Sequence, residues 1–225
     1  MLQNDYIMRL ITQFINAVAL LRRYQKAEEY EKALQTTGDT FTKLFGVGSD
    51  FFNSLSEENL INLLHTGGVL DRDKTVIIAA LLKIEGDVYD AQEKSDESFH
   101  RYLKSLHLYL ESYLYDNPGA RPQSVPADYY GDVEELLRKL DGYELPQYIK
   151  NRLWQYYERE GNYSRAEDLL YELYEDSPDN FIFDQGLAFY DRLLQKSDQQ
   201  LDAGDLPRDE VEEGRINWLA FKNEH

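Results

Sequence analysis

Apolar residues recur at spacings of three and four along most of the chain, which is the pattern of amphipathic helices. The first such stripe consists of Ile7, Leu10, Ile11, Phe14, Ile15, Val18 and Leu21. Helical segments are predicted at about 7–21, 25–45, 54–65, 71–89, 95–114, 128–141, 146–160, 163–174, 180–202 and from 207 onward. No stretch alternates apolar and polar residues as a strand does. We therefore expect an all-α protein of about nine or ten helices.

Residue types at the ends of these segments mark several helix boundaries. Gly46 and Gly161 are expected to end helices, because glycine adopts the left-handed conformation of a helix C-terminus without strain. Pro146 suits the first turn of a helix. The pattern Ser54-Leu55-Ser56-Glu57 predicts a capping box that begins at Ser54. Thr37-Gly38-Asp39 is a candidate kink or break in the second helix.

A proline-containing loop is predicted near the middle of the chain. Residues 116–127 hold three of the six prolines, Pro118, Pro122 and Pro126. Because proline interrupts helices, this segment is the expected boundary between an N-terminal half, 1–115, and a C-terminal half, 128–225. The sequence leaves open whether the halves are two domains or one continuous domain.

The formal net charge is -18, and the negative excess lies beyond residue 48. Residues 49–115 hold six basic and twelve acidic residues, and residues 116–225 hold twelve and twenty-five. An acidic surface repels phosphate backbones, so nucleic acid is not an expected partner. The charge is typical of a solvated surface, and a cationic partner is the alternative.

The chain contains no cysteine, which excludes disulfides, thiolate zinc sites and a cysteine nucleophile. No segment approaches the roughly 20 uninterrupted apolar residues of a membrane span. The apolar stretch near the N-terminus is interrupted by polar residues and lacks the features of a signal peptide. We expect a cytoplasmic protein that does not enter a membrane.

Two helix pairs resemble each other at a fixed offset of 68 residues, twice the roughly 34-residue period of tetratricopeptide repeats. Gly86, Tyr89, Ser98 and Tyr102 correspond to Trp154, Tyr157, Ala166 and Leu170. A small residue on one helix of such a pair allows close approach of the other helix. The stretch 153–170, closed by Pro178, resembles a tetratricopeptide repeat, and the pair over about 79–111 resembles a weaker copy. Glu85, where an apolar residue is usual, and Trp154, where a small one is usual, depart from the pattern.

Three further segments extend a resemblance over most of the chain. They are Asn4-Asp5-Tyr6-Ile7-Met8-Arg9, Phe189-Tyr190-Asp191-Arg192-Leu193-Leu194 and Arg208-Asp209-Glu210-Val211-Glu212-Glu213-Gly214. With them the chain is similar to an uncharacterised family of Gram-positive bacterial proteins with tetratricopeptide-like helices. That resemblance implies a helix-pair solenoid and a bacterial cytoplasm, and it implies no activity.

In repeats of this kind the first helix of each pair lines a concave face that binds a guest. The resemblance places seven residues on that face: Lys83, Asp87, Asp90, Tyr148, Asn151, Gln155 and Glu158. Related co-chaperone repeats use lysine and asparagine at such places to clamp a peptide carboxylate, and here Asp87 and Asp90 would repel one. A basic or neutral segment fits better. The alternative is that these are ordinary solvated helix residues.

The sequence also raises the possibility of a metal site. Glu97-Ser98-Phe99-His100 has the Glu-x-x-His spacing of di-iron helical bundles, which need that motif twice. His107 lies seven residues further on, and no third ligand is evident. No catalytic residue, metal or other cofactor is therefore expected.

Three hypotheses for function follow. The first is a non-catalytic adaptor that holds a protein or peptide on a concave, acidic face rich in tyrosine, of which the chain has eighteen. The second is a structural protein that self-associates through its apolar N-terminal helix. The third, and least favoured, is a metalloenzyme that uses carboxylates and His100.

Overall fold

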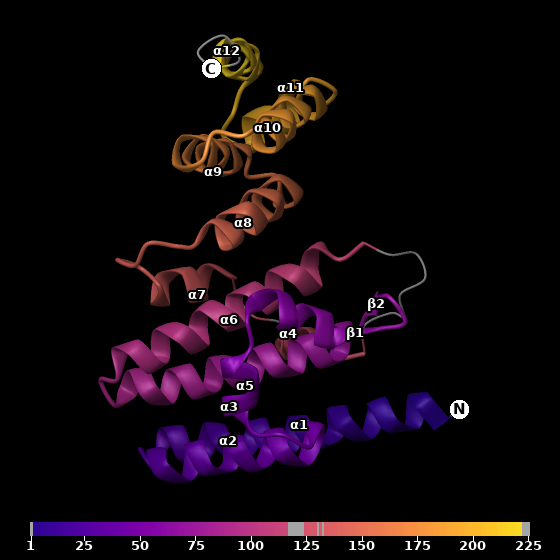
Figure 1. Cartoon of the computed structure of the whole chain (residues 1–225), viewed down its shortest axis with the longest axis vertical. Helices are drawn as coiled ribbons and strands as arrows, with labels where there is room; N and C mark the ends of the chain where they lie inside the picture. Colours follow the sequence, from indigo (N-terminus) through magenta and orange to yellow (C-terminus); the bar gives the residue numbers. More distant parts are fainter. Residues whose placement is uncertain (1, 117–123, 130, 132, 222–225) are drawn as a thin grey trace. The chain divides into compact units, whose positions relative to one another are not determined.

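The structure is a computed structural model that describes residues 2–116, 124–129, 131 and 133–221, and this part of the chain is all-α as predicted (Figure 1). Its α-helices are α1 (Leu2–Lys26), α2 (Tyr30–Phe45), α3 (Ser49–Ser54), α4 (Glu57–Leu64), α5 (Arg72–Ala91), α6 (Ser95–Leu114), α7 (Val133–Lys139), α8 (Gln147–Glu160), α9 (Tyr163–Asp176), α10 (Asn180–Leu193), α11 (Asp198–Ala203) and α12 (Arg208–Ala220). A short 3-10 helix, η1, spans Ala127–Tyr129.

These described residues form twelve α-helices rather than nine or ten, for two local reasons. Helix α3 has six residues, too few to establish a periodic stripe. The segment predicted as one helix over 180–202 is divided into α10 and α11. The division occurs because Ser197 caps a new helix: its hydroxyl accepts from the Gln200 backbone N–H, and the Gln200 side chain returns to the Ser197 backbone.

A hairpin of two-residue strands follows α4, where no strand was predicted. Strand β1 (His65–Thr66) pairs antiparallel with β2 (Val69–Leu70). The connecting Gly67 and Gly68 have φ values of 61° and 80°, as the tight turns of hairpins require. Strands of two residues are too short to show alternation in a sequence.

Most of the predicted helix boundaries agree with the structure. Gly46 and Gly161 end α2 and α8 with φ values of 80° and 82°. The capping box at Ser54 was wrong, because Ser54 ends α3 and the Ser56 hydroxyl accepts the Asn59 N–H at 3.3 Å. The predicted kink or break at Thr37-Gly38-Asp39 is not a break, since α2 continues through these residues.

The chain divides into two compact units, Met1–Tyr143 and Glu144–His225. Residues 117–123 of the predicted boundary loop lie outside the described residues. Residues 124–129 belong to the first unit. The buried Asp73 carboxylate fixes them there by accepting the backbone N–H groups of Ser124 and Val125 at 2.7 and 2.9 Å.

In the first unit α5 is the central helix, and it contacts α1, α2 and α6. Its run from Val76 to Leu82 is buried on all sides, which explains a helix that is apolar all round. Figure 1 shows α5 beside α6, and α1 beside α2. Gly86 of α5 allows α6 to approach closely, because its missing side chain makes room for the Tyr102 ring: a Cβ at Gly86 would lie 2.7 Å from Tyr102 Cε1.

Two buried charges of opposite sign hold α3 in the first unit. The Glu85 carboxylate accepts from the Ser49 hydroxyl at 2.9 Å and pairs with Arg101 at 3.4 Å. The Lys104 ammonium donates to the carbonyl oxygens of Phe52, Asn53 and Leu55 at 3.0, 2.5 and 2.6 Å. The departure from the repeat pattern at Glu85 therefore has a structural cause: this position binds an additional helix.

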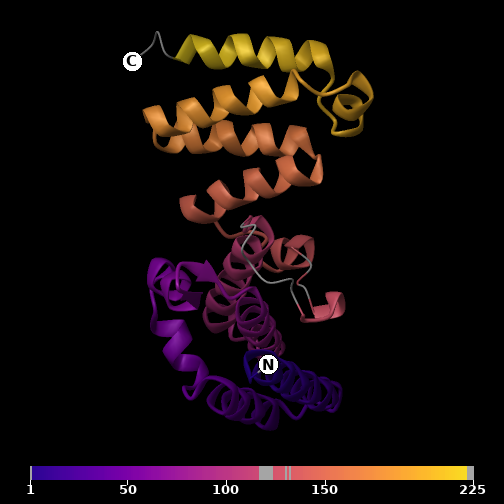
Figure 2. The ribbon, with the colours of Figure 1, turned by 90° about the vertical axis from the view of Figure 1, so that its right-hand side faces the viewer.

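The second unit stacks α8, α9, α10 and α12 in chain order (Figure 2). Ala166 is fully buried in the pair α8–α9, as the repeat pattern predicted. Trp218 of α12 is also fully buried, with its ring over Gly186 and its indole N–H donating to the Phe183 carbonyl at 2.9 Å. A solenoid that extends over the whole chain stays a prediction.

Candidate functional site

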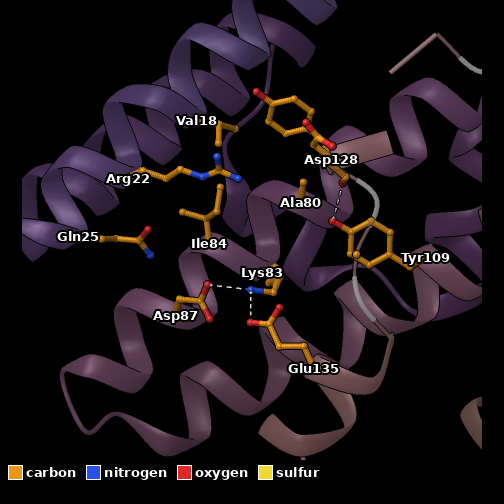
Figure 3. Close-up of a pocket in the computed structure, with 12 residues that line it drawn as sticks. Val18, Arg22, Gln25, Ala80, Lys83, Ile84, Asp87, Tyr109, Asp128 and Glu135 are labelled. Carbon is orange, nitrogen blue, oxygen red and sulfur yellow. Dashed lines mark hydrogen bonds and ion pairs between the residues drawn. The ribbon is translucent and has the colours of Figure 1, made fainter. Parts of the chain in front are cut away.

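The first unit contains a cavity of about 310 Å³ that five helical elements surround. Helices α1, α5, α6 and α7 and the 3-10 helix η1 each contribute lining residues (Figure 3). Its charged lining residues are Arg22, Lys83, Asp87, Asp128 and Glu135. Two of them, Lys83 and Asp87, are residues that the sequence analysis placed on a binding face.

Lys83 is held between two carboxylates at the wall of the cavity. Its Nζ lies 3.2 Å from Asp87 Oδ2 and 2.9 Å from Glu135 Oε1, and its side chain is 18% exposed. Burial alone lowers the pKa of Lys83, but the charges of Asp87 and Glu135 more than offset burial and raise it above the ordinary 10.5. Lys83 therefore carries its full positive charge at neutral pH. The two carboxylates neutralise that charge and leave the group of three side chains with one negative charge in excess.

A buried tyrosine orients Asp87 from behind. The Tyr102 hydroxyl donates to Asp87 Oδ1 at 3.0 Å, so both oxygens of that carboxylate have a partner. Burial first, and then the charge of Asp87, raise the pKa of Tyr102, which keeps the phenol a donor. One turn further along α5, Asp90 pairs with Lys139 of α7 at 2.7 Å.

Helix η1 forms another wall and is fixed by aromatic contacts. The Tyr129 ring packs edge-on against Phe14 of α1, with 5.1 Å between the ring centroids. The buried Tyr109 donates its hydroxyl to the Tyr129 carbonyl at 3.3 Å. Gly131 lies so close to the Tyr109 ring that a Cβ would overlap it. This wall is thus positioned by packing rather than by charge.

Two exposed charges at the cavity have no ion pair within the described residues: Arg22 and Asp128. The Arg22 guanidinium lies over the Tyr129 ring, 5.8 Å from its centroid, in cation–π geometry. Figure 3 shows the Arg22 side chain extending from α1 into the cavity. The cavity therefore combines carboxylates, an aromatic face and one weakly held cation.

The seven residues predicted for a concave face fall on both units: three on α5 and four on α8. On α5, Lys83 and Asp87 line the cavity, whereas Asp90 is not among its lining residues. The structure describes each unit by itself, so a single face that unites the two sets stays a prediction.

On α8 the four predicted residues make local contacts. The Asn151 side chain accepts the Trp154 indole N–H at 2.9 Å, and Gln155 donates to the Asn151 carbonyl at 2.9 Å. Glu158 binds Arg192 of α10 through both carboxylate oxygens, at 2.6 and 2.8 Å. Tyr148 is half-buried. These side chains are engaged within the second unit.

Sequence reasoning missed Arg22, Asp128, Tyr129 and Glu135. Arg22 lies on the polar side of α1, where it resembles a solvated residue. Asp128 and Tyr129 lie next to the proline-containing segment. Glu135 belongs to an adjacent pair of glutamates, and its partnership with Lys83 spans more than fifty residues of sequence. No local signal in the sequence reports such a contact.

The histidines of the proposed metal motif do not come together with further ligands. His100 is exposed and contacts the ring of Phe99, whereas the buried His107 lies 3.2 Å from Glu111. Across residues that the structure describes, no three His, Asp or Glu side chains are grouped closely enough to hold a metal ion.

One family model, described as a family of unknown function (DUF6483), matches residues 1–217. No curated protein and no solved structure matches the chain. Of the helices in the described ranges, none combines the length and apolar character needed to cross a membrane.

Proposed function

The chain belongs to DUF6483, a family of unknown function, and we propose that it is a non-catalytic adaptor that binds a protein or peptide segment through the cavity of its first unit. A tetratricopeptide-like use of helix pairs and a bacterial, cytoplasmic setting are parts of the same proposal. The guest is a basic or neutral segment, as the sequence indicates.

The observation that carries the proposal is the composition of the cavity wall. Three carboxylates, from Asp87, Asp128 and Glu135, face two cations, and one of those cations, Lys83, is already neutralised. The remaining lining consists of aliphatic and tyrosine side chains, the amide of Gln25 and the glycine Gly131. Such a mixture of apolar area and a few fixed polar groups is typical of binding sites rather than of solvated helix surfaces.

The size of the cavity favours one anchoring side chain over a whole folded element. A volume of about 310 Å³ lies at the lower end of the range for ligand sites. A peptide would insert a single long side chain there, and its backbone would lie along the rim. A peptide carboxylate would meet Asp87 and Glu135, which supports the expectation that a carboxylate clamp does not operate.

The two alternatives have less support. The apolar stripe of α1 is already buried within the first unit, with Phe14 and Leu21 fully covered, so a second copy would need other residues. The Glu97–His100 pair lacks a third ligand among the described residues. The adaptor therefore remains the proposal that the cavity supports best.

Filling the cavity tests this function. Ala80 lines the cavity and is 7% exposed, so Ala80→Phe places a ring in the space without changing any charge. Ala91→Phe is the matched control, because Ala91 is exposed at the end of the same helix. Peptides of about 12 residues with blocked ends are selected from a random display library on the full chain, and their affinities are measured by fluorescence anisotropy.

Ala80→Phe should weaken the selected peptides by about tenfold or more, roughly 1.4 kcal/mol, while Ala91→Phe leaves them unchanged. Circular dichroism checks that both variants keep their helical signal, and Ala80→Met serves if the phenylalanine variant does not fold. The proposed function would be refuted if the selected peptides bound wild type and Ala80→Phe equally, or if no peptide in the library bound the chain.

A further inference from the structure

We propose that the guest anchors in this cavity through an arginine side chain, whose guanidinium takes the place over the Tyr129 ring that Arg22 occupies in this structure. The inference rests on the proposed function and names the chemical class of the anchor. Arg22 then acts as a built-in competitor that the guest displaces.

The charges facing the cavity select a cation. Lys83 bridges Asp87 and Glu135 at 3.2 and 2.9 Å, so its charge is not available to attract an anion. Asp128 is exposed at the wall and has no ion-pair partner within the described ranges. A guest anion would be repelled by three carboxylates, whereas a guest cation can form an ion pair with the carboxylate of Asp128.

The aromatic wall selects a guanidinium among cations. The Arg22 guanidinium already lies over the Tyr129 ring, 5.8 Å from its centroid. Phe14 packs against that ring, and the Tyr109 hydroxyl holds the Tyr129 backbone by donating to its carbonyl. A planar guanidinium stacks on such a ring more effectively than a strongly hydrated ammonium does. Asp128 is the neighbouring residue of the same 3-10 helix and supplies a carboxylate to the same cavity.

Arg22 is suited to being displaced. Its side chain is exposed, it belongs to helix α1, and among the described residues it makes no ion pair that would have to break. When a guest guanidinium enters, Arg22 exchanges one aromatic contact for water and removes a repulsive charge from the cavity. Removing Arg22 should therefore strengthen guest binding, which is the opposite of what a residue that contacts an anionic guest would do.

The test uses four blocked pentapeptides of the form acetyl-Gly-Gly-X-Gly-Gly-amide, with X as arginine, lysine, citrulline or glutamate. Citrulline has the shape of arginine without its charge. Binding to the full chain is followed by NMR through the methyl groups of Val18 and Ile84, both of which line the cavity. The variants are Arg22→Ala, Asp128→Asn and the control Arg23→Ala, an exposed arginine on the same helix.

The arginine peptide should bind most tightly, Arg22→Ala should tighten it about two- to fivefold, and Asp128→Asn should weaken it by a similar factor. The weakening by Asp128→Asn should shrink between about 10 mM and 150 mM salt. Arg23→Ala should change nothing. Arginine and citrulline peptides that bind equally, a glutamate peptide that binds best, or weaker binding in Arg22→Ala would each overturn the inference and leave the adaptor function intact. If no peptide shifts the two methyl signals, the arginine inference fails, whereas the adaptor proposal is tested separately by the library selection and Ala80→Phe.

Discussion

Replacing Lys104 by methionine should destabilise the first unit more than any other single substitution of a lysine there. Lys104 is 8% exposed, and its Nζ donates to three carbonyl oxygens at the end of α3, those of Phe52, Asn53 and Leu55. The last carbonyls of a helix have no partners within it and favour a nearby cation. Methionine keeps the apolar stem of the side chain and removes only the ammonium.

The expected loss follows from these three hydrogen bonds. A hydrogen bond to a charged group contributes roughly 1.5–3 kcal/mol, so three of them sum to about 4.5 kcal/mol or more. Burial of the ammonium opposes this, since desolvation lowers the pKa of Lys104, and methionine removes that cost. We therefore expect Lys104→Met to lower the free energy of unfolding by about 3 kcal/mol, which is a large effect for one side chain.

Urea unfolding followed by circular dichroism measures the loss, and hydrogen exchange of peptides that cover residues 49–64 locates it. Protection in α3 and α4 should fall more than protection in α5. Lys43→Met is the control, because Lys43 is exposed on α2 and its removal should change stability by less than about 0.5 kcal/mol. A loss below about 1 kcal/mol for Lys104→Met, or unchanged protection in α3, would show that the ammonium does not hold that helix.

Two further predictions concern packing and burial of charge. A methyl group at Gly186 would overlap the buried Trp218 ring, so Gly186→Ala should lower the melting temperature, at a cost of about 1–3 kcal/mol, whereas Gly38→Ala has open space in α2 and should raise it slightly. Burial raises the folded-state pKa of Glu167 above 4.5, although its hydrogen bond from Tyr190 lowers it. The folded state therefore holds this proton more tightly, and the resulting stability is present below about pH 4.5 and lost as pH rises through the raised pKa. As the pH rises through this range, the melting temperature of Glu167→Gln should increase relative to that of wild type, and in acid the two should converge. A difference that stays constant from pH 4 to 8 would contradict this.

The helices that sequence reasoning located are those with long apolar stripes. Helices α1, α5 and α6 each span twenty residues or more, so their periodicity is unambiguous. Prediction from the sequence failed on short elements, whose presence or boundaries depend on a single contact. Helix α3 needs a lysine from α6, and the break before α11 depends on one serine side chain.

The candidate site was accessible from the sequence only in part. Lys83 and Asp87 were identified because a repeat pattern places them on one helix face. Their partner Glu135 and the aromatic wall at Tyr129 arise from segments far along the chain, and only the packed structure brings them together. Residues of one helix face can be predicted from periodicity, whereas a cavity requires knowing which faces meet.

The two ion pairs between α5 and α7 fix the register of the shorter helix. Glu135 of α7 faces Lys83, and Lys139, one turn later, faces Asp90, so the order of signs is reversed between the two helices. A slip of α7 by one turn would place Lys139 against Lys83 or Glu135 against Asp90, and an inverted α7 would do both. Each misplacement juxtaposes like charges. These two pairs, the first of which also helps to neutralise Lys83, therefore determine how a seven-residue helix is aligned, which its few apolar residues alone would specify poorly.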